Sequence, residues 1–125
     1  MLRSKGSAPI DFILIAVPML LVELAIIAIA INGYTKNIAQ DIAIEASQFA
    51  ALADQSAETA RANAIQELRD NLGSVFQATV SVARVNSASG ECLAESSVLI
   101  QPVGLGIFGA LGRLQLSGVS VCEVQ

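Results

Sequence analysis

Histidine and tryptophan are absent from this 125-residue chain, which also contains a single tyrosine. Without histidine the chain lacks the commonest general base and metal ligand, so no serine, cysteine or lysine has a histidine to activate it. Two cysteines do not make a zinc site. No phosphate-binding glycine motif with a following lysine is present, and the carboxylates are distributed singly. We therefore expect no enzyme, no cofactor, no metal and no small-molecule substrate.

Charge is scarce as well. Only 14% of the residues are charged, the formal net charge is −4, and the seven basic residues are scattered singly. A nucleic-acid partner is therefore not expected, because such a surface needs clustered cations. The hydrophobic fraction of 54% is high for a soluble protein, as is the mean hydropathy of +0.63. The length leaves room for one modest domain beside a membrane segment.

Residues 12–31 form a nearly unbroken apolar run. Twenty residues at about 1.5 Å each span roughly 30 Å, one hydrocarbon thickness. Arg3 and Lys5 precede the run and only Lys36 follows shortly after it, which predicts a cytoplasmic N-terminus and an extracytoplasmic C-terminal part. The run is too long for a signal-peptide core, and no small-x-small cleavage site follows it. We expect a single-pass cell membrane protein.

Two residues interrupt this run. Glu23 costs roughly 2.5–3.5 kcal/mol on insertion scales unless it is paired or protonated. It is either a protonated acid near the headgroups in a tilted helix or a contact to a partner helix. Pro18 removes one backbone hydrogen bond, so it marks either a tolerated kink or a point of local melting.

The start of the chain carries a further pattern. Lys5 and Gly6 stand before the apolar run, and an acid, Asp11, stands five residues after the glycine. A cut after Gly6 would remove the basic leader and leave the hydrophobic helix on the mature protein. This arrangement resembles the type IV prepilin signal, and the wider stretch resembles the TadE-like family of minor pseudopilins of tight-adherence pili. The residues that carry the resemblance are Lys5, Gly6, Ser7, Ala8, Ile10, Asp11, Phe12 and Pro18.

The chain departs from the family pattern at two positions. Asp11 stands where the family usually has glutamate, and Pro9 stands where a small residue is usual. The resemblance implies cleavage between Gly6 and Ser7 by a membrane prepilin peptidase. It also implies that Asp11, next to the aromatic Phe12, pairs with the new amine of a neighbouring subunit and sets the axial register.

The resemblance further implies a pilin-like plan, a long N-terminal helix backed by a C-terminal sheet. The expected partners are the membrane, the prepilin peptidase and other pilin or pseudopilin subunits. The soluble part is long beside the very short major pilins of this pilus class, which points to a minor subunit that enters a surface pilus.

Beyond the membrane segment the composition favours another helical stretch. Residues 37–72 contain neither proline nor glycine and are rich in good helix formers. Asn32 and Gly33 mark a possible break before this stretch, and Asn71 with Gly73 supplies a C-terminal stop. We therefore expect residues 12–72 to form one long, jointed helix.

This helix has two apolar stripes. The first consists of Ile38, Ile42, Phe49 and Leu52. The second is rotated from Phe49 by roughly 100–160° and consists of Ile65, Leu68 and Leu72. The two are either one drifting core stripe on a curved helix, or one face on the chain's own sheet and another on neighbouring subunits. A ladder of small residues would allow close helix approach: Ala46, Ala50, Ala53, Ala57, Ala60 and Ala64.

After Gly73 the hydrophobic period changes from 3.6 to 2, which indicates strands. We expect an α+β fold with a small antiparallel sheet of about three strands. Its alternation slips at Gly118, which suggests a β-bulge there. The expected order is a strand at 76–83, a turn at 86–90, a strand at 92–101, an apolar glycine-rich loop at 103–112 and a strand at 113–124.

The cysteines fit this hairpin. If the second and third strands pair across the loop, Cys92 lies opposite Cys122, and an extracytoplasmic location lets a disulfide form. Two buried free thiols are the alternative.

The expected regions are a leader at 1–6, a transmembrane helix at 7–31, an extracytoplasmic helix at 32–73 and a β domain at 74–125. Three classes of function are compatible with them. The first is a structural or assembly subunit of a tight-adherence pilus or related secretion filament. The second is an unprocessed membrane-anchored binding module or adhesin. The third is a small enzyme whose site the sequence does not reveal.

Overall fold

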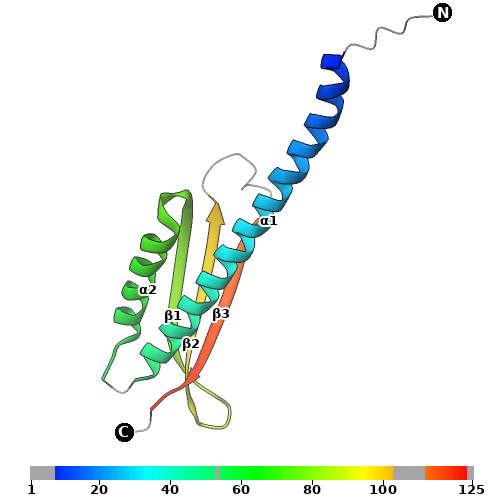
Figure 1. Ribbon diagram of the computed structural model, residues 1–125. Coiled ribbons are helices and arrows are strands. Elements are labelled where there is room, and N and C mark those ends of the chain that lie inside the picture. Colours follow the sequence, from blue (N-terminus) through cyan, green and yellow to red (C-terminus); the bar gives the residue numbers. More distant parts are fainter. Residues whose placement is uncertain (1–7, 53, 103–111, 124–125) are drawn as a thin grey trace, which may run out of the picture. The chain divides into compact units, whose positions relative to one another are not determined.

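The computed structural model describes residues 8–52, 54–102 and 112–123. The fold is α+β, as the sequence predicted. In chain order the elements are α1 (Ala8–Ala51), α2 (Ala57–Leu72), the 3-10 turn η1 (Gly73–Val75), β1 (Phe76–Asn86), β2 (Cys92–Pro102) and β3 (Leu114–Val121) (Figure 1). The chain divides into two compact units at the boundary between Ile31 and Asn32, and α1 contributes residues to both.

The prediction of one helix over residues 12–72 is wrong. Helix α1 ends at Ala51, and α2 begins at Ala57 after a short connection. Ser56 is the N-cap of α2, where its hydroxyl accepts a hydrogen bond from the Thr59 N–H at 3.1 Å. A serine cap satisfies a donor that a continuing helix would have bonded itself, so it favours a new helix start.

The possible break at Asn32 and Gly33 is absent, because α1 runs through both residues. A single interior glycine costs a helix about 1 kcal/mol and does not end it. The predicted stop is confirmed: α2 ends at Leu72, and Gly73 follows with a φ of 66° and donates its N–H to the Arg69 carbonyl.

The sheet is three-stranded and antiparallel, in the order β1-β2-β3. Val80 pairs with Val98, and Val98 pairs with Leu116 across the middle of the sheet. The three strands lie close to their expected positions, although β1 continues to Asn86. The predicted loop at 103–112 falls almost wholly outside the described residues.

The predicted bulge at Gly118 is wrong. The register between β2 and β3 is uninterrupted from Leu93–Val121 to Ile100–Leu114, with Gly118 opposite Ser96. Gly118 occupies a buried position in regular alternation, while Val119 and Val121 lie on the exposed face. The hydrophobic pattern slipped because the inward position carries a glycine, not because the backbone shifts.

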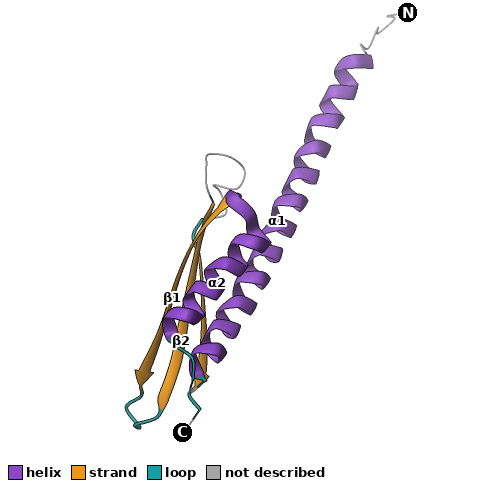
Figure 2. Ribbon diagram, turned by 90° about the vertical axis from the view of Figure 1, so that its left-hand side faces the viewer, coloured by secondary structure: helices purple, strands orange, loops and turns teal. Residues whose placement is uncertain are grey.

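Within the second unit, the larger of two hydrophobic clusters of described residues joins the sheet to both helices (Figure 2). Its buried residues are Ala39, Ile42, Ala43, Ala46, Ala64, Leu68, Val80, Val98, Ile100 and Leu116. Both predicted apolar stripes contribute to it, since Ile42 and Leu68 are buried together and Ile65 and Leu72 pack against them. The interpretation that one of the two stripes meets neighbouring subunits is therefore wrong, because the helix reversal turns both stripes toward the chain's own core.

Candidate functional site

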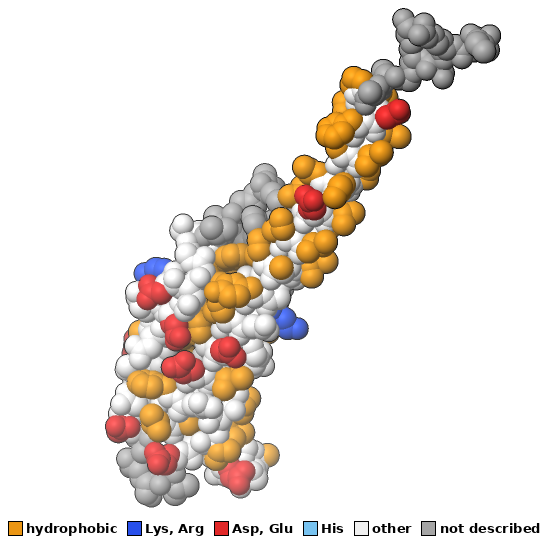
Figure 3. All heavy atoms as spheres, viewed as in Figure 1, with side chains coloured by type: hydrophobic (Ala, Val, Ile, Leu, Met, Phe, Trp, Pro, Cys, Tyr) orange, Lys and Arg blue, Asp and Glu red, His pale blue; other side chains and the backbone are white. Residues whose placement is uncertain are grey.

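The N-terminal part of α1 is an exposed hydrophobic helix. Phe12 is 72% exposed, Leu14 74% and Ile29 72%, and the large apolar residues between them are also exposed. Figure 3 shows apolar side chains covering this part of α1, with acidic side chains among them. Helix Pro9–Ala51 contains an 18-residue window of mean hydropathy 2.8 with none of it buried, so one described helix is long and apolar enough to cross a membrane.

Asp11, Phe12 and Glu23 all lie on this helix with exposed side chains. Asp11 is in the first turn, where a carboxylate interacts favourably with the helix dipole. The side-chain hydrogen bonds between described residues include none to the carboxyl group of Asp11 or of Glu23. Helix α1 also continues through Pro18. The predicted processing residues Lys5, Gly6 and Ser7 lie outside the described residues.

The predicted disulfide is present. Cys92 begins β2 and Cys122 directly follows β3, with their Cα atoms 5.3 Å apart and their sulfur atoms bonded. The Cys122 N–H also donates to the Cys92 carbonyl at 2.9 Å, which continues the ladder between the strands. The alternative of two free thiols is thereby excluded, and the bond ties the end of the chain to the sheet.

A second tie holds the C-terminal part of α1 against β3. An ideal Cβ atom on Gly118 would lie 2.5 Å from the Ala43 carbonyl oxygen and 2.9 Å from the Ile44 Cα. The buried Ser96 hydroxyl donates to the same Ala43 carbonyl, and Gln40 Nε2 donates to the Ser117 carbonyl at 3.1 Å. The helix backbone therefore rests directly on the strand, which only glycine allows at position 118.

Arg84 is a structural residue that the sequence analysis missed. From β1 its Nε donates to the Ala50 carbonyl at 2.7 Å, and its guanidinium also donates to the carbonyls of Leu52 and Gln55. These carbonyls belong to the end of α1 and the connection after it, where helix acceptors have no partner within the helix. The available signal was a lone arginine in an otherwise uncharged strand.

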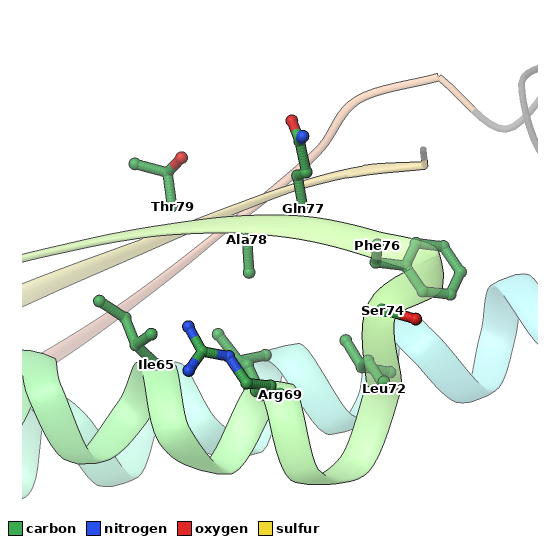
Figure 4. Close-up of a pocket in the computed structure, with 10 residues that line it drawn as sticks. Ile65, Arg69, Leu72, Ser74, Phe76, Gln77, Ala78 and Thr79 are labelled. Carbon is green, nitrogen blue, oxygen red and sulfur yellow. The ribbon is translucent and has the colours of Figure 1, made fainter. Parts of the chain in front are cut away.

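A hollow of about 470 Å³ lies between α2 and the start of β1 (Figure 4). Ile65, Leu72 and Ala78 line it together with Arg69, which reaches from α2 toward the strand. Its lining contains no acid and no cysteine, and the described residues contain no cluster of acids or cysteines that fits a metal ion. The hollow therefore presents one cation beside both apolar and polar side chains, the latter from Ser74, Gln77 and Thr79.

One carboxylate in the second unit, that of Glu67, lies where its ionised form is disfavoured. Partial burial raises the pKa of Glu67, and the neighbouring Glu45 and Asp70 raise it further by repulsion. Glu45 and Glu67 both line a small groove between α1 and α2. The two helices thus bring like charges together, a pairing that is unfavourable when both acids are ionised.

Comparison with known proteins adds no relative. No family model matches the chain, and no curated protein or solved structure matches it.

Proposed function

We propose that the chain is a structural or assembly subunit, a minor pilin or pseudopilin, of a tight-adherence pilus or related secretion filament. The observation that carries the proposal is the 44-residue helix α1. Its N-terminal part presents apolar side chains around an early carboxylate, Asp11, and its C-terminal part is built into a disulfide-linked α+β unit. An anchored helix joined to a rigid extracytoplasmic unit suits a subunit held in a membrane before it enters a helical assembly.

Processing follows from the resemblance of the leader to the prepilin signal. The peptidase cuts between Gly6 and Ser7, removes the cytoplasmic basic leader and exposes an amine on Ser7. The span at 12–31 then remains as the anchor, and the unit that begins at Asn32 stays outside the membrane.

Asp11 is the residue that this amine meets. In a bundle of packed helices the Ser7 amine of one subunit pairs with Asp11 of a neighbour, while Phe12 packs beside the pair. Opposite charges attract far more strongly in a medium of low dielectric constant than in water, so the pair sets the axial register. The exposed position of Asp11 on α1 supports this role.

The test is N-terminal sequencing and intact mass of the protein from its native membrane. We expect a mature chain that begins at Ser7, and Gly6→Ala should slow or block the cut. Asp11→Ala should leave the cut largely intact and reduce incorporation into filaments. A chain that still begins at Met1 in cells with an active peptidase would contradict the proposal, as would unchanged incorporation of Asp11→Ala.

The outer face of the sheet favours a second candidate, an unprocessed membrane-anchored binding module. A shallow hollow of about 360 Å³ lies there, and exposed polar side chains such as Ser81, Glu95 and Gln115 line it. A flat polar face of this kind fits a partner outside the cell. If the bond after Gly6 is uncut in native membranes and the second unit still binds a partner outside the cell, this function is favoured over the first.

A further inference from the structure

The exposed part of α1 carries a repeat that the proposed function does not explain. Six of its residues follow one another at alternating steps of four and three: Phe12, Ala16, Met19, Glu23, Ile26 and Ala30. In an α-helix this spacing places the side chains along one side, as in the contact seam of a left-handed helix pair. We call these six residues the heptad seam.

The structure has a hollow on this seam. A groove of about 300 Å³ is lined by Phe12, Ile15, Ala16, Met19, Leu20 and Glu23. Four of these are seam residues, and Ile15 and Leu20 flank them on either side. Ala16 is half-buried between its larger neighbours, so the groove has the shape that receives a side chain from a second helix.

Glu23 determines which helix fits. It is the only Asp, Glu, Lys or Arg residue between Asp11 and Lys36. A lone carboxyl group in hydrocarbon is unfavourable unless it is protonated and hydrogen-bonded, and such residues almost always face a protein partner. We propose that α1 pairs in parallel with α1 of a second copy along the heptad seam, and that the two Glu23 side chains hydrogen-bond to each other across the pair.

A second copy satisfies Glu23 better than an unrelated helix does. Inserted in the same orientation, it carries its own Glu23 to the same depth. The two side chains then hydrogen-bond to each other inside the pair, which keeps both away from the lipid. Ala16 and Ala30 stand one heptad before and after Glu23, and small residues let two helix backbones approach closely.

A glycine supports the same pairing. In the sequence the repeat extends to Gly33, seven residues after Ile26. Glycine inside a helix is unfavourable, yet a Cβ atom on Gly33 would meet no atom within 4 Å in the described chain. The chain's own fold therefore does not require glycine at this position, and a small residue there lets a second helix approach closely.

The inference rests on the membrane-spanning part of the proposed function, and its first test uses the uncleaved full-length chain. Sedimentation equilibrium in density-matched micelles should show a dimer. Glu23→Leu should weaken dimerisation about 5- to 30-fold, the usual effect of one interhelical hydrogen bond in a membrane. Glu23→Gln should retain the dimer, because two amides also hydrogen-bond to each other.

Cysteine crosslinking in lipid vesicles supplies the matched control. Ala30→Cys on the seam should form an intermolecular disulfide on oxidation, whereas Ala28→Cys, about 200° around the helix, should not. Cys92 and Cys122 are already bonded to each other, so the introduced thiol reacts alone.

Three outcomes would overturn the pairing. They are a monomer at every concentration, dimerisation that Glu23→Leu leaves unchanged, and equal crosslinking at positions 28 and 30. Pairing of Glu23 with a lysine-bearing transmembrane helix in place of a second copy would likewise replace the homodimer. Because neither assay needs a pilus or a peptidase, a monomer leaves the proposed function standing, and an uncut leader leaves the dimer standing.

Discussion

Helix α1 passes through two regions that use apolar residues in opposite ways. In the first unit large side chains such as Leu14 and Ile29 are almost fully exposed, whereas in the second unit the same helix buries mainly alanines. Ala39 and Ala43 are 0% exposed, and few large side chains are fully buried. The most hydrophobic stretch of the chain thus adds nothing to the core. The core combines helix alanines, which let helix and strand backbones come close, with larger side chains such as Leu68 and Val98, and covalent and polar ties hold them.

Breaking a tie should unfold the second unit and leave the exposed N-terminal part of α1 helical. The largest effect is expected for the double substitution Cys92→Ser and Cys122→Ser. The bond closes a loop with a sequence separation of 30 residues, and its loss should lower the free energy of unfolding by about 3–4 kcal/mol. Protease treatment of the full chain in vesicles should then remove the second unit and leave a protected helix fragment.

Ser89→Ala, in the exposed turn beside Cys92, is the control for the disulfide and should keep the protease resistance of the parent. Equal resistance of the double serine variant and the parent would contradict the assignment of the disulfide as a main tie.

The next largest effect is expected at Gly118 in β3, and Gly33 in α1 serves as its control. Gly118→Ala forces a Cβ atom against the Ala43 backbone and should destabilise the second unit by about 1–3 kcal/mol. Gly33→Ala meets nothing within 4 Å and should be neutral or stabilising by up to about 1 kcal/mol. Thermal unfolding followed by circular dichroism compares the two, and equal melting temperatures would refute the close approach at Gly118.

Substitution of Arg84 tests whether its hydrogen bonds stabilise the end of α1. Arg84→Met removes the donors to the carbonyls of Ala50, Leu52 and Gln55 and should cost about 1.5 kcal/mol. Amide hydrogen exchange should accelerate around residues 50–56 before it does so in the sheet. Arg84→Lys should rescue only part of the loss, because an ammonium group lacks the planar fork that reaches several carbonyls. If amide hydrogen exchange around residues 50–56 is unchanged in Arg84→Met, then Arg84 does not stabilise the end of α1.

The smallest effect concerns Glu67. Its pKa is raised in the folded state, so the folded chain binds this proton more tightly than the unfolded chain. Stability from this group is therefore present below the ordinary glutamate pKa of 4.5 and is lost as the pH rises through the raised pKa of the folded state. Glu67→Gln should remove that loss and stabilise the second unit at neutral pH by a few tenths of a kcal/mol, since exposed like charges are screened. Denaturant unfolding of the parent and of Glu67→Gln at pH 4 and pH 7 tests this prediction. It would be contradicted if the substitution left the pH dependence of the free energy of unfolding unchanged.

The local features of the chain were predictable from its sequence. Hydropathy alone indicates a helix long enough to cross a membrane, and the change of period after Gly73 gives three strands near their observed positions. The disulfide followed from strand order, because a hairpin across one loop brings Cys92 opposite Cys122. These features depend on neighbours in sequence or on one pairing, which a linear pattern records.

Only the tertiary structure decided the rest. The two apolar stripes face one core because the chain reverses at Ser56, and helix composition carries no record of which way a helix must turn. Gly118 reads as a bulge until the Ala43 backbone is seen against it, and Arg84 reads as a solvated charge until three carbonyls surround it. In each case the deciding partner is remote in sequence, so close packing assigns the residue its role and local periodicity does not.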